Sequence, residues 1–209
     1  VNTIGNLFLL GDELEDLSQL EGKKILSAGE NATPMYVLNL LLKDLDVDVS
    51  YLPSHADVVA AASEAQADYY VLPEPFVSLF KNKVGETWSL DLAQVYEEKT
   101  SYPLTMGVIV TTQSKLDEKK KDIEKFLDDY RASVARVLSE PEASAELIAD
   151  YGIIENAALA KAAIAGSGLA FESPREMKEA IEAYFELLMA ENPQSIGGEL
   201  PGEDFYGDY

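Results

Sequence analysis

Three apolar, strand-like runs alternate with two helical patterns between residues 25 and 72, and this order restricts the possible folds more than any other feature. The runs cover residues 25–28, 47–52 and 69–72, and the apolar residues between them recur at the spacing of a helix face. Strand, helix, strand, helix, strand within roughly 50 residues implies two right-handed βαβ crossovers and a parallel sheet. We therefore predict an α/β fold.

The two helices of this region have recognisable starting points. Thr33 and Pro34 fit an N-cap residue followed by a first-turn proline, and Ser54 fits the N-cap of the second helix. One face of the first helix would be formed by Met35, Leu38, Leu41, Leu42 and Leu45. Both helices should therefore begin shortly after a strand ends.

Residues 68–76 read Asp-Tyr-Tyr-Val-Leu-Pro-Glu-Pro-Phe and join the third strand to a further helix. The strand should be fully buried because it has no polar alternation, and Pro73 and Pro75 should end it. A helix-like apolar pattern then begins at Phe76. The carboxyl end of a parallel strand is where open α/β sheets bind ligands. Glu74 is therefore predicted to lie at the mouth of a site.

The composition excludes several classes of protein. The 209 residues include 38 acidic and 16 basic side chains, and the formal net charge of −22 disfavours nucleic acid and anionic membrane surfaces as partners. A solubilising acidic surface is the ordinary explanation, and adaptation to salt is the alternative. The absence of cysteine excludes disulfides, thiolate metal sites and a cysteine nucleophile. Because the acidic residues do not have the spacing of a calcium loop, we expect no metal and no cofactor.

The remainder of the chain has fewer strand-like runs and more helical patterns. Residues 3–10 look like a strand, and a chain that starts inside an apolar strand suggests a piece cut from something longer. Residues 89–96 and 104–112 are also strand-like. Helices are expected over residues 116–138, 140–151, 156–165 and 174–191. No run reaches the roughly 18 apolar residues of a membrane-spanning helix, so any export signal is expected outside this chain.

Four segments together resemble a known family. They are residues 20–25 (Leu-Glu-Gly-Lys-Lys-Ile), 28–34 (Ala-Gly-Glu-Asn-Ala-Thr-Pro), 67–76, and 192–201 with Phe205 and Tyr206 after it. Their order and spacing cover nearly the whole chain. The set resembles the extracytoplasmic substrate-binding proteins of ABC transporters of the nitrate, sulfonate, taurine and thiamine-precursor type.

This resemblance implies a two-lobed, periplasmic-binding-protein-like fold of type II, with the ligand held between the lobes. Residues 1–11 would be a crossover strand from the first lobe, and residues 12–103 the second α/β lobe. Residues 104–209 would supply a return strand and C-terminal helices that pack on the first lobe. That first lobe would be incomplete in this chain, because much of it would precede Val1.

The same resemblance implies a function and partners. The chain would be the solute-binding component of an ABC importer, not an enzyme, with a small-molecule ligand and membrane permease subunits as partners. It would be extracytoplasmic, either periplasmic or lipid-anchored at the outer face of the cell membrane. Its ligand would be small and polar, like an aminopyrimidine or like a sulfonate or nitrate. Closure of the lobes around the ligand would capture it.

Candidate ligand contacts lie where helices begin. Gly29, Asn31 and Thr33 precede or open the first helix, where backbone N–H groups and the helix dipole favour an anionic or acceptor group. Ordinary helix capping explains the same residues without a ligand. Ser54 and His55 allow the same two interpretations. The lone histidine fits a first-turn helix residue better than a catalyst, because no second histidine or cysteine accompanies it.

Glu74 and Tyr102 complete the predicted ligand-binding residues. A carboxylate at residue 74 would accept hydrogen bonds from an amine, amidine or aminopyrimidine and would oppose a bare anion, so it favours a ligand with a donor group. Its alternative is a solvent-exposed or first-turn carboxylate. Tyr102 precedes Pro103 and would offer an aromatic face to the ligand, whereas Tyr69 and the tyrosine after it belong to the core.

Proteins of this fold also include enzymes and regulators. Menaquinone-pathway and pyrimidine-precursor synthases look like binding proteins, as do the ligand-sensing effector domains of transcription regulators. An enzyme requires a placed base, nucleophile or metal. This chain offers little beyond Glu74 and tyrosines, so these functions are kept as alternatives.

Overall fold

The computed structural model describes residues 1–207, which form two compact units. The sheet unit is Gly5–Leu104. The helical unit joins residues 1–4 to the described residues from Thr105 onward. The chain therefore passes between the units twice, before Gly5 and after Leu104.

A five-stranded sheet forms the centre of the sheet unit. Its strands are β2 (Phe8–Gly11), β3 (Lys24–Ala28), β4 (Asp48–Leu52), β5 (Tyr69–Leu72) and β6 (Trp88–Asp91), in the order β4-β3-β5-β2-β6. β3 pairs in parallel with β4 and β5, whereas β2 pairs antiparallel with β5 and β6. The three strands predicted between residues 25 and 72 are confirmed. The sheet is mixed and not wholly parallel, because β2 is inserted with the opposite direction.

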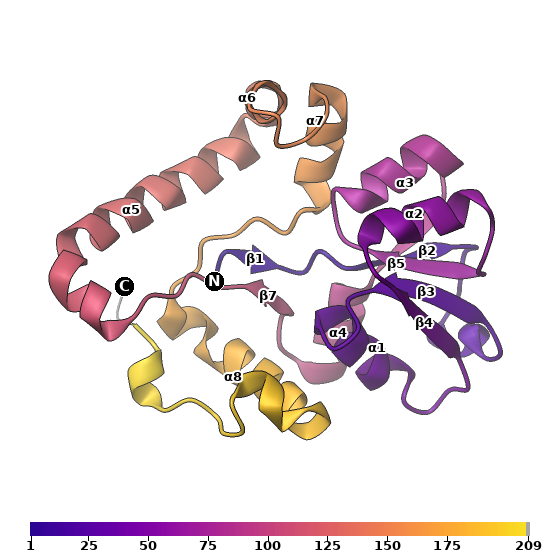
Figure 1. The fold of residues 1–209 in the computed structure, drawn as a ribbon, viewed down its shortest axis with the longest axis horizontal. Coiled ribbons are helices and arrows are strands. Elements are labelled where there is room, and N and C mark those ends of the chain that lie inside the picture. Colours follow the sequence, from indigo (N-terminus) through magenta and orange to yellow (C-terminus); the bar gives the residue numbers. More distant parts are fainter. Residues whose placement is uncertain (208–209) are drawn as a thin grey trace. The chain divides into compact units, whose positions relative to one another are not determined.

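Helices cover both faces of this sheet. They are α1 (Thr33–Leu42), α2 (His55–Ser63), α3 (Phe76–Val84) and α4 (Leu92–Thr100), with the short 3-10 helix η1 (Leu17–Leu20) before β3. α2 and α3 pack together on one face, and α1 and α4 on the other (Figure 1). The core between the sheet and these two helices, α2 and α3, includes Leu10, Leu26, Val58, Leu72 and Phe80. β5 is buried along its whole length, as predicted.

Local hydrogen bonds explain where the first helices begin. The Ser54 hydroxyl accepts a bond from the Asp57 backbone N–H at 3.2 Å, which confirms the predicted cap of α2. Thr33 is the first helical residue of α1, and Ala32 takes the N-cap position that had been predicted for Thr33. Pro34 lies in the first turn, as predicted.

Three strand predictions were too long. Residues 3–10 are not one strand, because Gly5 (φ 79°) and Asn6 (φ 69°) break it into β1 (Thr3–Ile4) and β2. Residues 89–96 change from β6 to α4 where the Asp91 carboxylate accepts a bond from the Ala93 N–H at 2.9 Å. Residues 104–112 contribute only β7 (Thr105–Gly107), and the apolar residues after it are exposed.

The helical unit contains β1 and β7, which pair antiparallel, and the predicted helices. These are α5 (Gln113–Ser139), α6 (Pro141–Asp150), α7 (Ala157–Gly166) and α8 (Pro174–Glu191), followed by η2 (Pro193–Ile196) and η3 (Glu203–Phe205). α6 and α7 pack together around Ala145, Ala160 and Ile164. α8 starts with a reciprocal capping box between Ser173 and Glu176. The four helices predicted after residue 112 are thus confirmed.

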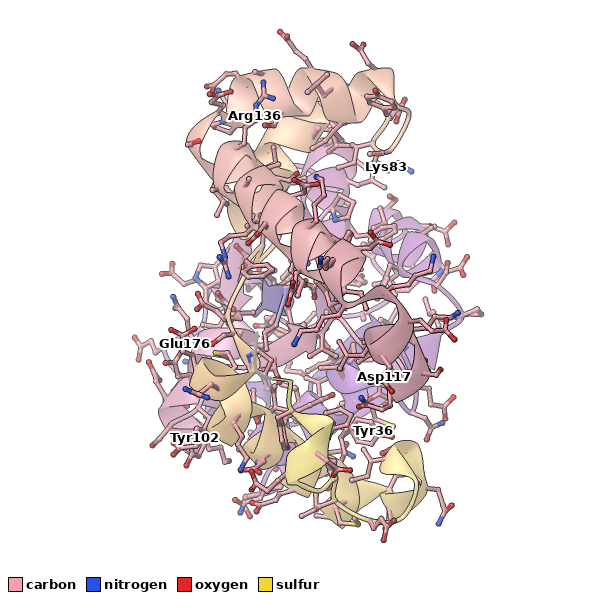
Figure 2. All side chains as sticks on the ribbon, turned by 90° about the vertical axis from the view of Figure 1, so that its left-hand side faces the viewer. Tyr36, Lys83, Tyr102, Asp117, Arg136 and Glu176 are labelled. Carbon is pink, nitrogen blue, oxygen red and sulfur yellow. The ribbon has the colours of Figure 1, made fainter. Side chains whose placement is uncertain are left out.

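α5 is the most exposed helix of this unit. Of its 27 residues only Val134 is buried. Asp117 and Arg136 mark the two ends of the helix in Figure 2, with charged side chains between them. Across residues 1–207, no helix is both long enough and apolar enough to span a bilayer.

We predict that Gly11→Ala destabilises the sheet unit. A Cβ atom at Gly11 would lie 2.4 Å from the Tyr69 ring and 2.9 Å from the Asp68 carbonyl oxygen, so the strands must shift. Overpacking of this kind costs about 1–3 kcal/mol in the free energy of unfolding, which urea denaturation measures.

The matched control is Gly22→Ala. Gly22 has φ 71° but no atom within 4 Å of an added Cβ, so it reports the backbone cost alone, about 1 kcal/mol. Equal losses for the two variants would contradict the crowding at Gly11.

Candidate functional site

The carboxyl ends of the parallel strands lie at one edge of the sheet, which we term the carboxyl edge. It comprises residues 29–33 after β3, residues 53–55 after β4, residues 73–76 after β5, Asp91 at the end of β6, and Asn6 before β2. Helices α1 to α4 each begin here. Four helix N-termini therefore direct positive dipole ends to one edge.

These four helix N-termini are not equivalent. Side chains cap two of them, with Ser54 at α2 and Asp91 at α4. A carboxylate oxygen of Glu74 accepts a bond from the Ser78 N–H of α3 at 3.1 Å. α1 has Ala32 at its N-cap position and no side-chain cap. In the first turn of α1, Pro34 has no N–H and the Met35 N–H donates to the Ala32 carbonyl at 3.0 Å, so what this helix offers an acceptor or anionic group is mainly its dipole.

The loop before α1 is held in an unusual backbone conformation. Gly29 (φ 86°) and Asn31 (φ 61°) both lie in the left-handed region. The Tyr36 side chain, which is only 2% exposed, donates a hydrogen bond from its hydroxyl to the Asn31 carbonyl at 3.2 Å. The Ala32 N–H also donates to the Gly29 carbonyl at 3.0 Å. The structure thus brings Gly29, Asn31 and Thr33 together as one fixed turn at the carboxyl edge.

Glu74 lies at this edge, and its carboxylate is already engaged. One oxygen accepts from the Ser78 N–H, and the other accepts from the Ser78 hydroxyl at 3.0 Å. The side chain is half-buried, and this burial raises its pKa, while the bonds from Ser78 and the charge of Lys81 act in the opposite direction. Each carboxylate oxygen has a second lone pair, so Glu74 both caps α3 and can accept a further bond.

Asn6 fixes the position of Glu74 and was not anticipated from the sequence. Its side-chain oxygen accepts from the Glu74 backbone N–H at 2.6 Å, and its amide nitrogen donates to the Glu74 carbonyl at 3.4 Å. The side chain therefore replaces a strand partner for the turn after β5. The signal in the sequence was the Gly5-Asn6 pair, a dipeptide that favours left-handed backbone and interrupts strands.

His55 contacts an aromatic ring from the neighbouring turn. Its ring centroid is 5.1 Å from that of Phe76, with the planes tilted by 44°. Its Nδ1 atom is buried and has no hydrogen-bond partner among the described residues. Burial lowers the pKa of His55 from its usual 6.5. At pH 7 the side chain is therefore mainly a neutral imidazole, and it lies at the carboxyl edge, next to Ser54 in the chain.

Tyr102 lies two residues before Leu104, whose carbonyl accepts a bond from the Gly5 N–H at 2.8 Å, where the chain leaves the sheet unit. It follows α4, and its backbone is tied to the Thr100 hydroxyl, which accepts from the Tyr102 N–H at 3.2 Å. Figure 2 shows it well separated from Tyr36, whose hydroxyl holds the loop before α1. Tyr69 and Tyr70 are buried in β5, where the sequence placed them. Within residues 1–207, no three His, Asp or Glu side chains are grouped to hold a metal ion.

The family described as menaquinone biosynthesis has a sequence model that matches residues 4–190. The chain belongs to this family. A comparison with curated proteins gives no significant match.

Several solved structures share the fold of this menaquinone biosynthesis family member. An ABC transporter protein from Parabacteroides distasonis is 23% identical with a TM-score of 0.80, covering 99% of this chain and 72% of its own. The alkanesulfonate-binding protein SsuA of Xanthomonas axonopodis pv. citri, solved bound to MOPS, is 16% identical with a TM-score of 0.64. The match covers 91% of this chain and 67% of the SsuA chain. The aliphatic sulphonate binding protein SsuA of Escherichia coli is 14% identical with a TM-score of 0.61. That match covers 88% of this chain and 64% of the Escherichia coli protein. The predicted α/β, periplasmic-binding-protein-like fold is thereby confirmed.

We predict that His55 titrates below pH 6.5 in the folded protein. The chain has one histidine, so a single pair of imidazole proton signals reports its pKa directly by NMR. As the pH falls, the unfolded chain takes up the proton first, because its pKa is higher. The contribution of neutral His55 to stability is therefore complete above pH 6.5 and is lost as the pH falls from 6.5 to the folded-state pKa.

The control for this titration is His55→Gln. The melting temperature of the His55→Gln variant should depend less on pH, just below pH 6.5, than that of the unchanged protein. A folded-state pKa at or above 6.5 would contradict the burial of the imidazole.

Proposed function

We propose that the chain is the solute-binding component of an ABC importer and that the carboxyl edge of its sheet forms one wall of the ligand site. The observation that carries this proposal is the convergence of the four helix N-termini, those of α1 to α4, at that edge. The fold shared with ABC substrate-binding proteins supports the same function.

The two sides of this wall differ in the groups that they offer. The first turn of α1 attracts an acceptor or anionic group mainly through its dipole. Glu74 accepts bonds from a donor such as an amine or an aminopyrimidine nitrogen. We therefore propose a small polar ligand that carries both an N–H donor and an acceptor or anionic group. Gly29, Asn31, Thr33, Ser54, His55 and Tyr102 are proposed to surround it.

This function also implies a place and a partner. A solute-binding component works outside the cytoplasm and delivers its ligand to permease subunits in the membrane. Binding proteins of this kind exchange between open and closed forms, and a ligand shifts that equilibrium only by its difference in affinity for the two.

A ligand panel with one designed variant tests this proposal. The panel contains 2-aminoethanesulfonate and 4-aminopyrimidine, which carry both groups, with ethanesulfonate and ethylamine as single-group compounds. We expect the two-group compounds to raise the melting temperature most. We also expect Glu74→Gln to remove their advantage, whereas the same change at exposed Glu98 leaves it intact. Equal stabilisation by ethanesulfonate, with none by any nitrogen donor, would overturn the proposed ligand class.

Ala32→Asp separates ligand binding from folding. Ala32 has the extended backbone of an N-cap residue, and an aspartate there can accept only from the Met35 N–H, which also donates to the Ala32 carbonyl, so it should stabilise the protein by about 0.5 kcal/mol, the low end for a cap. Its charge should at the same time repel the anionic group of the ligand. We therefore expect a higher melting temperature together with weaker binding of 2-aminoethanesulfonate.

Ala32→Asn is the matched control, because it caps the helix without a charge. It should stabilise the fold to a similar extent and weaken binding less than Ala32→Asp. Unchanged sulfonate binding in Ala32→Asp would place the anionic group away from α1.

An enzymatic function on the same fold is the second candidate, and the menaquinone biosynthesis family supports it. Glu74 has a raised pKa at the edge of the sheet, which is a property of catalytic acids and bases. However, both of its oxygens accept bonds from Ser78, and His55 contacts Phe76 without a polar partner for Nδ1 among the described residues.

Mass spectrometry distinguishes the two candidates. The compound that stabilises the protein most is incubated with it at equal concentration, and the mass of the released compound is measured. A binding protein returns the compound unchanged, which is the result that we expect. A new product that disappears in Glu74→Gln would establish the enzyme instead.

A further inference from the structure

A cavity lies in the sheet unit, at the edge opposite to the carboxyl edge. Its volume is about 450 Å³. Gly11 at the end of β2, Asp68 before β5 and Trp88 at the start of β6 line it, together with residues from the ends of α2 and α3. This amino-edge cavity is separated from the proposed ligand wall by the length of the strands, and it lies within the size range of small-molecule sites.

The floor of the cavity is aromatic and apolar. Phe80 is 2% exposed and Tyr70 is 5% exposed, and their ring centroids are 5.6 Å apart. The Tyr70 hydroxyl donates to the Ala67 carbonyl and accepts from the Ala67 N–H, both at 3.0 Å, so it is already satisfied. The half-buried Trp88 adds a third ring. Tyr70 and Phe80 therefore close the floor, and Trp88 is the ring that offers exposed surface to an occupant.

The rim of the cavity is acidic. Its charged lining residues are Asp12, Glu13, Asp68 and Glu86, and no lining residue within the described chain is basic. The Asp68 carboxylate is fixed by a bond from the Lys24 backbone N–H at 2.8 Å. The local field also acts on Tyr69, whose pKa is raised first by burial and then by the charges of Asp12 and Asp68. The cavity is thus a region of negative potential.

The helices that end at this cavity add to that potential. α2 ends at Ser63 with no basic residue in its last turn, and the carbonyl ends of helices carry partial negative charge. α3 ends close by with two lysines in its last turn. Of these, Lys81 is directed to the Ser89 hydroxyl at 3.4 Å, and Lys83 is exposed and points away from the ribbon in Figure 2.

The spacing of the carboxylates distinguishes between two kinds of cation. Among residues 1–207 no set of three acidic or histidine side chains converges closely enough to hold a metal ion. A ring of separated carboxylates above aromatic faces instead suits a cation whose charge is spread over an apolar body.

We propose that the amino-edge cavity is a binding site for a small organic cation, such as a quaternary ammonium compound. The cationic head lies over Trp88 and is surrounded by the carboxylates of the rim, and its apolar substituents displace water from the floor. This site is separate from the carboxyl edge and does not depend on the solute that binds there.

The single tryptophan of the chain makes this site directly observable. Choline is titrated into the protein, and the fluorescence of Trp88 is followed. We expect a saturable change with choline and none with 3,3-dimethyl-1-butanol, its neutral isostere. Addition of calcium alone should leave the spectrum unchanged. A response to the neutral isostere equal to that of choline, or no saturable response to choline at millimolar concentration, would overturn the proposal.

Charge variants test the role of the rim. The double variant Asp12→Asn with Glu86→Gln should weaken choline binding by about tenfold, since each carboxylate contributes Coulomb attraction close to the cation. The control is Glu146→Gln with Asp150→Asn on α6, which makes the same change in net charge on exposed residues of the helical unit. Equal losses in the two double variants would assign the effect to net charge and overturn the site. Because Glu74→Gln leaves Trp88 and the rim in place, it should not change choline binding, and this keeps the test independent of the proposed transport function.

Discussion

The antiparallel insertion of β2 between β5 and β6 is the constraint on which the sheet unit depends. Residues 25–72 alone would make three parallel strands, β4-β3-β5. β2 extends this sheet by pairing with β5 through Phe8 to Leu10, and it provides the edge on which β6 pairs. Because its direction is reversed, its first end lies at the carboxyl edge and its last end at the amino edge. Asn6 therefore reaches the Glu74 backbone, while Gly11 allows the Tyr69 ring to approach closely.

Much of the sheet unit was predictable because its signals are local. The βα alternation, the burial of β5, the cap at Ser54 and the start of α3 at Phe76 each follow from a few neighbouring residues. The direction of β2 was not predictable in this way, since it is fixed by pairing with strands that are more than 55 residues away in the sequence. The length of β6 was overestimated for a related reason, because apolar residues that face the core from α4 imitate the continuation of a strand.

The candidate site was partly predictable. Helix N-termini after parallel strands occur at the same sheet edge, so the turns that carry Asn31, Ser54 and Glu74 had to lie near one another once the topology was known. The sequence did not show that Ser78 engages the Glu74 carboxylate or that Phe76 contacts His55. Both contacts depend on side-chain directions within adjacent turns. Tyr102 was predicted from its position at the presumed crossover between the lobes, and it does lie close to the point where the chain leaves the sheet unit after Leu104; its role at the site stays a prediction.

The two edges of the sheet have opposite electrostatic character, and this resolves an apparent conflict with the composition. At long range a net charge of −22 repels an anionic solute. However, charges more than about 8 Å apart are largely screened at physiological ionic strength, so the local groups decide what binds. At the carboxyl edge four helix N-termini face outward, and the N-cap residues of two of them make no side-chain cap. At the amino edge helix C-termini and carboxylates surround aromatic rings. A sheet with helices that all begin at one edge therefore separates positive from negative dipole ends whatever its net charge, and the carboxylates that lie at the carboxyl edge, Glu74 and Asp91, are engaged by backbone N–H groups of α3 and α4.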